Sequence, residues 1–86
     1  MNKNEILSKL IPLLSKQLSI EPDTITGPSL LVDDLGADSL DTAEIAMMIQ
    51  EEFNYDLKDN EMQTIKTVDD IVRILEAGET IQNKNQ

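Results

Sequence analysis

The 86-residue chain contains no histidine, cysteine or tryptophan, and only one tyrosine and one phenylalanine. Without cysteine it has no disulfides and no CxxC motif, and without histidine it has no Ser-His-Asp triad. The core of the single small domain that this length allows must therefore be aliphatic. No apolar run reaches the roughly 18 residues that a membrane-spanning helix needs. We therefore expect no membrane insertion and, since cysteine is absent, a cytoplasmic protein.

Positive charge is also scarce, and the acidic residues are concentrated in the middle of the chain. The net charge is −10, and residues 33–61 hold ten acids against a single base, Lys58. Such a segment repels nucleic-acid phosphates and attracts basic protein surfaces. We therefore expect basic protein partners and no nucleic acid, while the simpler interpretation is a solvated face that keeps the protein dissolved.

Apolar residues recur at helical spacing near the N-terminus and predict a first helix over residues 4–18. Pro12 lies inside it, and proline removes a backbone donor and clashes with the preceding turn. We therefore expect a kink or break near Ile11, or a helix in two pieces. Residues 19–38 then form a long loop whose apolar side chains should pin it to the core. These apolar residues are Ile20, Ile25, Leu30, Leu31, Val32 and Leu35.

A second helix is predicted from Ser39 to about Phe53. Asp38 is a good N-cap, and Asp41, three residues further on, completes a pattern like a capping box. Asn54 is the expected stop. This places Ser39 in the first turn of the helix.

A short third helix is predicted over residues 59–65, and Thr67 is the expected cap of a fourth, with Gly78 as its terminator. The polar C-terminal residues are expected to be disordered. The chain is therefore predicted to be all-α, a small four-helix bundle with three main helices, a short third helix, and a long loop between helices one and two. It divides into one domain over residues 1–77 and a flexible tail over residues 78–86.

The second helix has two faces. At about 100° per residue, Ile45, Ile49 and Phe53 fall together and form the predicted core face. Leu40 and Met47 fall nearly opposite, with acidic residues beside them. Single exposed apolar residues are ordinary, so two on one acid-rimmed stripe are either incidental or an anchor for a protein partner.

Ser39 lies where a helix begins and has no histidine to activate it. In the simplest interpretation it is an ordinary first-turn residue. No GxSxG pattern surrounds it, and the chain lacks the imidazole and thiolate ligands of a zinc site, so we expect no enzymatic activity. The third interpretation is covalent modification. A phosphodiester at Ser39 would lie at the positive end of the helix dipole, although Asp38 and Asp41 oppose it.

The stretch from Asp34 to Asp41, with the sequence Asp-Leu-Gly-Ala-Asp-Ser-Leu-Asp, resembles the prosthetic-group attachment motif of bacterial acyl carrier proteins. The resemblance continues through residues 51–53 and 65–68. It covers roughly residues 4–77 and indicates a discrete carrier of the type II fatty acid synthase kind.

This resemblance implies a covalent cofactor at Ser39. The serine would accept 4′-phosphopantetheine from coenzyme A through a separate holo-synthase, a phosphopantetheinyl transferase. The terminal thiol would then carry acyl groups as thioesters between enzymes of fatty acid biosynthesis. Because the reactive groups belong to the cofactor and the partners, the missing histidine and cysteine are explained.

The resemblance also implies a monomer whose partners are acyltransferases and ketosynthases with basic docking patches. The residues that match the family's recognition surface are Asp38, Leu40, Asp41, Glu44, Met47, Glu51 and Glu52.

The sequence departs from the family pattern at positions outside the attachment motif. Leu31 stands where phenylalanine is usual, and Lys58 stands where proline is usual. Gln50 replaces a common acid, and Pro12 is unusual in the first helix. These departures leave a specialised acyl or polyketide carrier open beside a housekeeping carrier. An acidic helical adaptor that is never modified is the alternative from another class.

Overall fold

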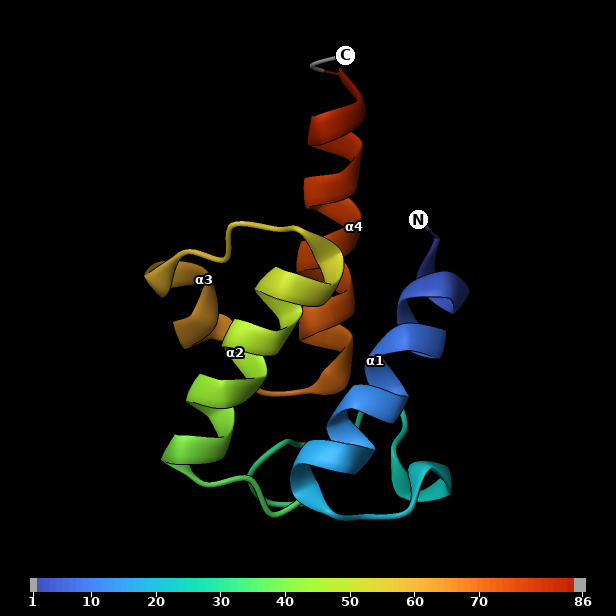
Figure 1. Ribbon diagram of the computed structural model, residues 1–86, viewed down its shortest axis with the longest axis vertical. Helices are drawn as coiled ribbons and strands as arrows, with labels where there is room; N and C mark the ends of the chain where they lie inside the picture. The colour runs from blue at the N-terminus through green and yellow to red at the C-terminus, as the bar shows by residue number, and fades with distance from the viewer. Residues whose placement is uncertain (1, 85–86) are drawn as a thin grey trace.

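The structure is a computed structural model that describes the backbone of residues 2–84 and the side chains of residues 2–78. Its elements, in chain order, are α1 (Lys3–Leu18), the short 3₁₀ helix η1 (Pro22–Thr24), α2 (Ser39–Phe53), α3 (Asp59–Thr64) and α4 (Val68–Lys84) (Figure 1). Over the described residues, the only strand-like pairing is an isolated bridge between Leu30 and Thr67. The predicted all-α bundle with a short third helix is therefore confirmed.

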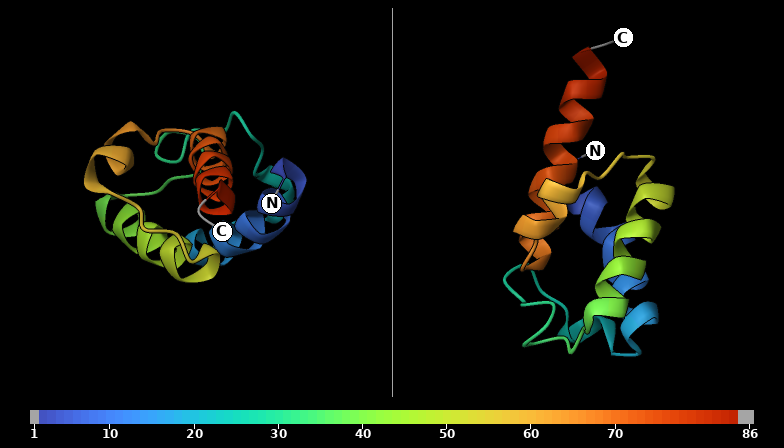
Figure 2. Two further views of the ribbon diagram at one scale, coloured as in Figure 1. Left: turned by 90° about the horizontal axis from the view of Figure 1, so that it is seen from above. Right: turned by 90° about the vertical axis from the view of Figure 1, so that its left-hand side faces the viewer.

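The helices α1, α2 and α4 surround the core, and α3 lies at one edge of the bundle (Figures 1 and 2). The C-terminal turns of α4 extend beyond the other helices (Figure 1). None of the described helices is long and apolar enough to cross a membrane. The core is aliphatic, as the composition requires, and consists of Ile6, Leu10, Leu14, Ile25, Leu31, Leu35, Ala37, Ile45, Ile49, Val68, Ile71, Val72 and Leu75.

The helix α1 is continuous through Pro12, so the expected break or division into two pieces is wrong. Pro12 is exposed, and the carbonyl that loses its partner belongs to Ser8, which is also exposed. Water can therefore take the place of the missing donor. Leu10 and Leu14, on either side of the proline, are fully buried and hold both halves of α1 against the same core.

The loop between α1 and α2 is attached to the core through its apolar residues, as predicted. Ile25, Leu31 and Leu35 are buried. Val32 is the exception, because 59% of its surface is exposed. The chain turns within residues 30–37, and an irregular turn cannot direct three consecutive apolar side chains inward.

Backbone hydrogen bonds also tie this loop to the connection between α3 and α4. Three bonds of 2.8–3.2 Å cross the junction: Leu31 N–H to Lys66 O, Val68 N–H to Ser29 O, and Asp69 N–H to Gly27 O. Residues 27–31 therefore lie against residues 66–69, although the two segments are far apart in sequence. The segment that leads to Ser39 is thus held by the C-terminal half of the chain.

The helix α4 begins where predicted. The Oγ1 atom of Thr67 accepts the N–H of Asp70 at 3.1 Å, and Oδ2 of Asp70 accepts the N–H of Thr67 at 3.0 Å. This reciprocal pair fixes the start of the helix.

The predicted end of α4 at Gly78 is wrong, because the helix continues to Lys84. Gly78 is buried, and a Cβ atom there would overlap the ring of Tyr55. The glycine therefore allows a close approach within the helix and does not end it. The backbone of the predicted tail is therefore helical as far as Lys84. Its flexibility stays a prediction, since residues 85–86 and the side chains of 79–84 lie outside the described residues.

Candidate functional site

Ser39 is the first residue of α2, and its side chain is exposed. A capping box fixes the helix start. Oδ1 of Asp38 accepts the N–H of Asp41 at 2.9 Å, and Oδ2 of Asp41 accepts the N–H of Asp38 at 3.2 Å. Both carboxylates are therefore turned toward the backbone. Within the described part of the chain, the Ser39 hydroxyl has no hydrogen-bond partner, which leaves it free to react.

The turn before α2 is anchored to the core and directs the chain into the helix. Gly36 has a φ of 79°, a left-handed conformation that glycine adopts without a Cβ clash. Its neighbours Leu35 and Ala37 are buried. The N–H of Ala37 donates to the carbonyl of Leu31 at 2.9 Å. Ser39 is thus exposed on a rigid support.

The two faces predicted for α2 are confirmed. Ile45 and Ile49 are buried, and Phe53 packs against the core. On the other side, Leu40 and Met47 are 71% and 62% exposed. The helix therefore presents two large apolar side chains to solvent on the side away from the core.

The seven residues matched to the family's recognition surface all lie on α2 or at its cap. They are exposed, except Asp41, which is half-buried by the capping box. Glu44 accepts a 3.3 Å hydrogen bond from Nε2 of Gln17 on α1. This contact is long and exposed, so it leaves the Glu44 carboxylate accessible.

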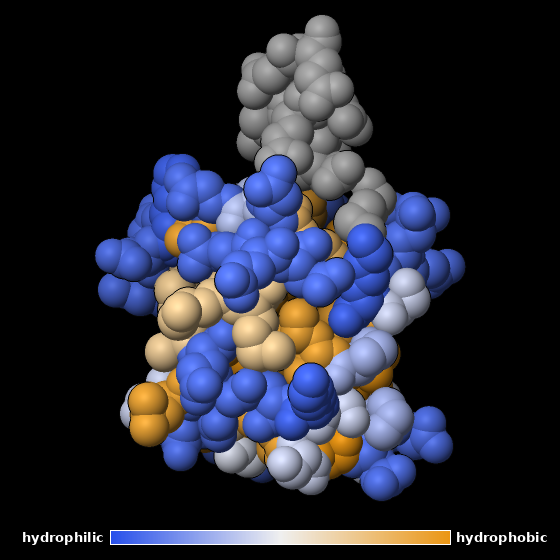
Figure 3. Space-filling model, in the orientation of Figure 1, coloured by the Kyte–Doolittle hydropathy of each residue, from blue (hydrophilic) through white to orange (hydrophobic). Residues whose placement is uncertain are grey.

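The C-terminal part of α2 shares a groove with α1. Apolar side chains and both signs of charge line this groove: Ser8, Lys9, Pro12, Leu13, Lys16, Met48, Glu51 and Glu52. On the face drawn in Figure 3, apolar surface lies between bands of hydrophilic side chains. Because the lysines of α1 lie near Glu51 and Glu52, they partly offset the negative charge at this end of α2. The uncompensated acids are those nearer Ser39.

A small apolar cavity lies between α2, α3 and the core. Its volume is about 30 Å³, close to the share of one water molecule in the liquid. Thr42, one helical turn after Ser39, contributes to its wall. The cavity is lined by Leu31, Thr42, Ile45, Ala46, Ile49, Leu57, Met62, Ile65 and Ile71.

An open hollow beside the start of α2 was not predicted from the sequence. It is lined by Leu30, Leu31, Val32, Asp33, Thr42, Ile65 and Lys66. Val32, which we assigned to the core, is instead an exposed apolar residue on its rim. The sequence held one sign that one of these residues is exposed. Three apolar residues follow one another in a loop, and a turn cannot bury all of them.

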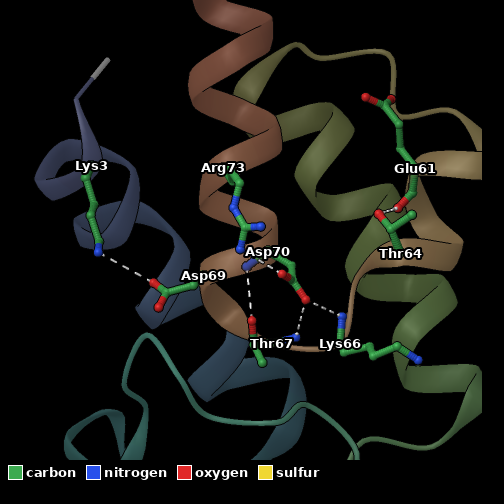
Figure 4. A network of polar contacts seen from close by, with 8 residues as sticks. All are labelled: Lys3, Glu61, Thr64, Lys66, Thr67, Asp69, Asp70 and Arg73. Carbon is green, nitrogen blue, oxygen red and sulfur yellow. Dashed lines mark hydrogen bonds and ion pairs between the residues drawn. The ribbon is translucent and has the colours of Figure 1, made fainter.

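A polar network supports the site from the C-terminal half of the chain (Figure 4). Oδ2 of Asp70 accepts the N–H of Lys66 at 2.9 Å and that of Thr67 at 3.0 Å. These backbone donors, with Lys66 the largest cause, lower the pKa of Asp70. Nearby, Nζ of Lys3 lies 3.6 Å from Oδ1 of Asp69 and links α1 to α4. The segment that holds the loop before Ser39 is therefore itself fixed by an ionised carboxylate.

Residues 8–75 match the family described as "Phosphopantetheine attachment site". An acyl carrier protein of Thermosynechococcus vestitus is 39% identical over 72 residues, which cover 84% of this chain and 89% of the relative. One from Prochlorococcus marinus is 42% identical over 77 residues, which cover 90% and 96%. The chain belongs to the acyl carrier protein family. A solved acyl carrier protein from Enterococcus faecalis, noted for high thermal stability, has a TM-score of 0.76 at 29% identity, covering 91% of this chain and 99% of that one.

As an acyl carrier protein, the chain is a carrier and not a catalyst, and its cofactor is covalently attached 4′-phosphopantetheine. Acyl carrier proteins in general interact with a phosphopantetheinyl transferase and with fatty acid synthesis enzymes. Membership of this family excludes the alternative function, an acidic helical adaptor that is never modified.

The start of α2 fits this cofactor. A phosphodiester needs a free hydroxyl, which Ser39 offers, and hydrogen-bond donors for the phosphate oxygens. The N–H groups of Ser39 and Leu40 lie in the first helical turn and have no intrahelical partner. When bound, the group supplies a terminal thiol that holds acyl chains as thioesters.

Proposed function

We propose that Ser39 is the residue that accepts 4′-phosphopantetheine from coenzyme A. The serine oxygen forms a phosphodiester as the pyrophosphate bond of coenzyme A breaks and adenosine 3′,5′-bisphosphate leaves. The observation that carries this proposal is the exposed Ser39 hydroxyl, without a hydrogen-bond partner, at the N-terminus of α2. The chain holds no histidine or cysteine, and the carboxylates of Asp38 and Asp41 are bonded to backbone N–H groups, so we assign the base that takes the serine proton to the transferase. The role of this chain is to present the hydroxyl and to offer two backbone donors to the phosphate.

Intact mass measurement tests the attachment residue directly. The full chain is incubated with coenzyme A, Mg²⁺ and a broad-specificity phosphopantetheinyl transferase. We expect the mass of one phosphopantetheine group to be gained, and Ser39→Ala to abolish the gain. Ser8→Ala, which removes another exposed serine, is the matched control and should be modified normally. Modification of the Ser39→Ala variant would place the attachment elsewhere.

We further propose that the carried groups are fatty acyl chains in biosynthesis. The similarity to acyl carrier proteins over most of the chain supports this. The alternative is a specialised acyl or polyketide carrier, which the departures at Leu31, Gln50 and Lys58 leave open. Mass analysis of the acyl groups on the modified protein, purified from its native cell, separates the two. A series of saturated chains supports fatty acid synthesis, and a single unusual acyl group supports the specialised carrier.

The apolar cavity beside Thr42 is the place that we propose for an acyl chain when it folds back onto the protein. Its lining is almost entirely apolar, but at about 30 Å³ it holds no more than one small group. A longer chain therefore requires the walls of the cavity to move apart.

We propose that partner enzymes bind the outer side of α2, with Leu40 and Met47 as apolar anchors and the acids as the charged rim. Exposure of both apolar side chains beside uncompensated acids supports this. The acids would meet basic patches on acyltransferases and ketosynthases, and exposed charge contacts of this kind speed association.

Steady-state kinetics with a transferase or ketosynthase partner test this surface. We expect Glu44→Lys and Met47→Ala to lower kcat/KM about 5- to 50-fold without changing the melting temperature. The Glu44 effect should shrink as salt rises, because salt screens exposed charges. Glu21→Lys makes the same charge change at an exposed residue near η1 and is the control. Equal kinetics for all three variants would show that partners do not use the outer side of α2.

We also propose a monomer, since copies with a net charge of −10 repel one another. Sedimentation equilibrium checks this. The cytoplasmic location stays a prediction that cell fractionation tests.

A further inference from the structure

The helix α3 forms one wall of the apolar cavity but is weakly packed. It has six residues and no fully buried side chain. Met62, within α3, and Ile65, directly after it, line the cavity and are half-buried. So short a helix has little stability of its own. Whatever holds α3 in place therefore also keeps the cavity small.

Glu61 of α3 is bonded through both of its carboxylate oxygens. Oε1 accepts the N–H of Lys58 at 3.1 Å, at the start of the helix. Oε2 accepts the hydroxyl of Tyr55 at 2.7 Å. These bonds lower the pKa of Glu61, with the tyrosine bond as the largest cause. A single ionised carboxylate thus fixes the start of α3 and attaches it to a residue outside the helix.

The ring of Tyr55 is in turn fixed to α4. It packs against the core and lies so close to the backbone of Gly78 that a Cβ atom would overlap it. Glycine is unfavourable inside a helix. The close approach of the Tyr55 ring is the structural reason for a glycine at position 78. Burial, followed by the hydrogen bond and charge of Glu61, raises the pKa of Tyr55 to about 12, so its hydroxyl keeps its proton.

We propose that Tyr55 is a strap that joins α3 to α4, through Glu61 on one side and Gly78 on the other, and so sets how often the cavity opens. The proposal rests on the proposed function only in one respect, namely that an acyl chain occupies the cavity. The strap is a property of the unmodified chain, and its test needs no cofactor. Tyr55 acts here as a positioning residue, since it contacts α3 and α4 and does not line the cavity.

Amide hydrogen exchange of the full, unmodified chain measures the opening of α3. Tyr55→Phe keeps the ring and removes the hydroxyl. We expect the amides of residues 62–65 to exchange about tenfold faster, the size expected for losing a hydrogen bond to a charged acceptor. The amides of α1 around Leu10 should not change. Glu61→Gln, which keeps an acceptor oxygen, should retain part of the protection, and Glu61→Ala should lose it.

Gln17→Ala is the matched control, because it removes another hydrogen bond between side chains, at 3.3 Å to Glu44, away from α3. It should leave the exchange of α3 unchanged. Exchange in Tyr55→Phe that equals the wild type, or that rises equally in α1 and α3, would overturn the proposal.

Substitution at Gly78 tests the other attachment of the strap. Gly78→Ala favours the helix α4 by propensity but displaces the Tyr55 ring. We expect α3 to exchange about tenfold faster even if the chain melts at a higher temperature. In a Tyr55→Ala background the same substitution should have no further effect on α3. Unchanged α3 exchange in Gly78→Ala, with the fold intact, would show that the ring contact does not restrain α3.

Discussion

At the scale of single residues, Asp70 connects several backbone and side-chain groups at the start of α4. Its carboxylate accepts two backbone N–H groups from the connection before α4, and Nη2 of Arg73 lies 2.9 Å from Oδ1. The same connection bonds to the loop that precedes Ser39. The ionised carboxylate of Asp70 therefore helps to hold the loop that leads to Ser39.

This gives a pH dependence for stability. The pKa of Asp70 is lowered in the folded state, first by the N–H of Lys66 and then by that of Thr67. The stabilisation is therefore complete above the unfolded pKa of about 4. It is lost as pH falls below 4 through the folded pKa. We expect Asp70→Asn to cost about 1 kcal/mol at pH 7 and to flatten the decline of melting temperature at acid pH.

Circular dichroism melts between pH 7 and pH 2 check this. Asp23→Asn, at an exposed acid in η1, is the control and should leave the curve unchanged. If the melting temperature of Asp70→Asn fell with pH as steeply as that of the wild type, Asp70 would not be the source of this pH dependence.

The residues that sequence reasoning placed correctly are those whose role is local. Asp38, Asp41 and Asn54 bound α2 through bonds within a few residues, so spacing alone reveals them. The roles of Val32 and Gly78 depend on the direction of a turn and on an aromatic ring from a distant segment. The only local sign for Val32 is the run of three apolar residues in a loop, and nothing near Gly78 in the sequence distinguishes it from a helix terminator.

At the scale of elements, α1 shows how packing can override a local rule. Leu10 and Leu14, two residues to either side of Pro12, are buried in the same core, so the helix continues where proline alone would interrupt it. Helix propensity is a weak guide when tertiary contacts oppose it. The bounds of α2, which no proline interrupts, followed directly from the sequence.

The cost of the proline should nevertheless be measurable. We expect Pro12→Ala to stabilise the protein by about 1–3 kcal/mol, because it restores the donor to the Ser8 carbonyl and removes the ring clash. Urea unfolding gives the change in free energy. Leu13→Ala, which shortens the half-buried neighbour, should destabilise instead. No gain in Pro12→Ala would mean that water already satisfies the carbonyl at no cost.

At the scale of the whole molecule, negative charge is concentrated and little of it is neutralised. Residues 33–61 hold ten acids. Among the described residues, the only ion pair within this segment joins Lys58 and Asp56 at 3.8 Å, and both are exposed. Exposed pairs of this kind add little stability, so repulsion among the acids acts against folding.

Salt should therefore raise the melting temperature. At 0.1 M ionic strength, charges more than about 10 Å apart are largely screened, and we expect a rise of about 5 °C or more. Mg²⁺ should raise it further at equal ionic strength. A double variant of exposed acids nearer Ser39, Asp33→Asn with Glu44→Gln, should respond less than the wild type. A flat response to both salts would show that charge repulsion does not limit stability.

The contact between residues 27–31 and residues 66–69 could not be predicted from the sequence, because it joins segments that no local pattern connects. It also sets an order of events during synthesis. Ser39 emerges from the ribosome well before residues 66–69, whose backbone groups anchor the loop that precedes it. A growing chain therefore exposes Ser39 on an unsupported loop, and the rigid surface for the transferase exists only once α4 has begun to form. Under the function proposed for Ser39, a transferase that binds the folded start of α2 must therefore act after this contact has formed.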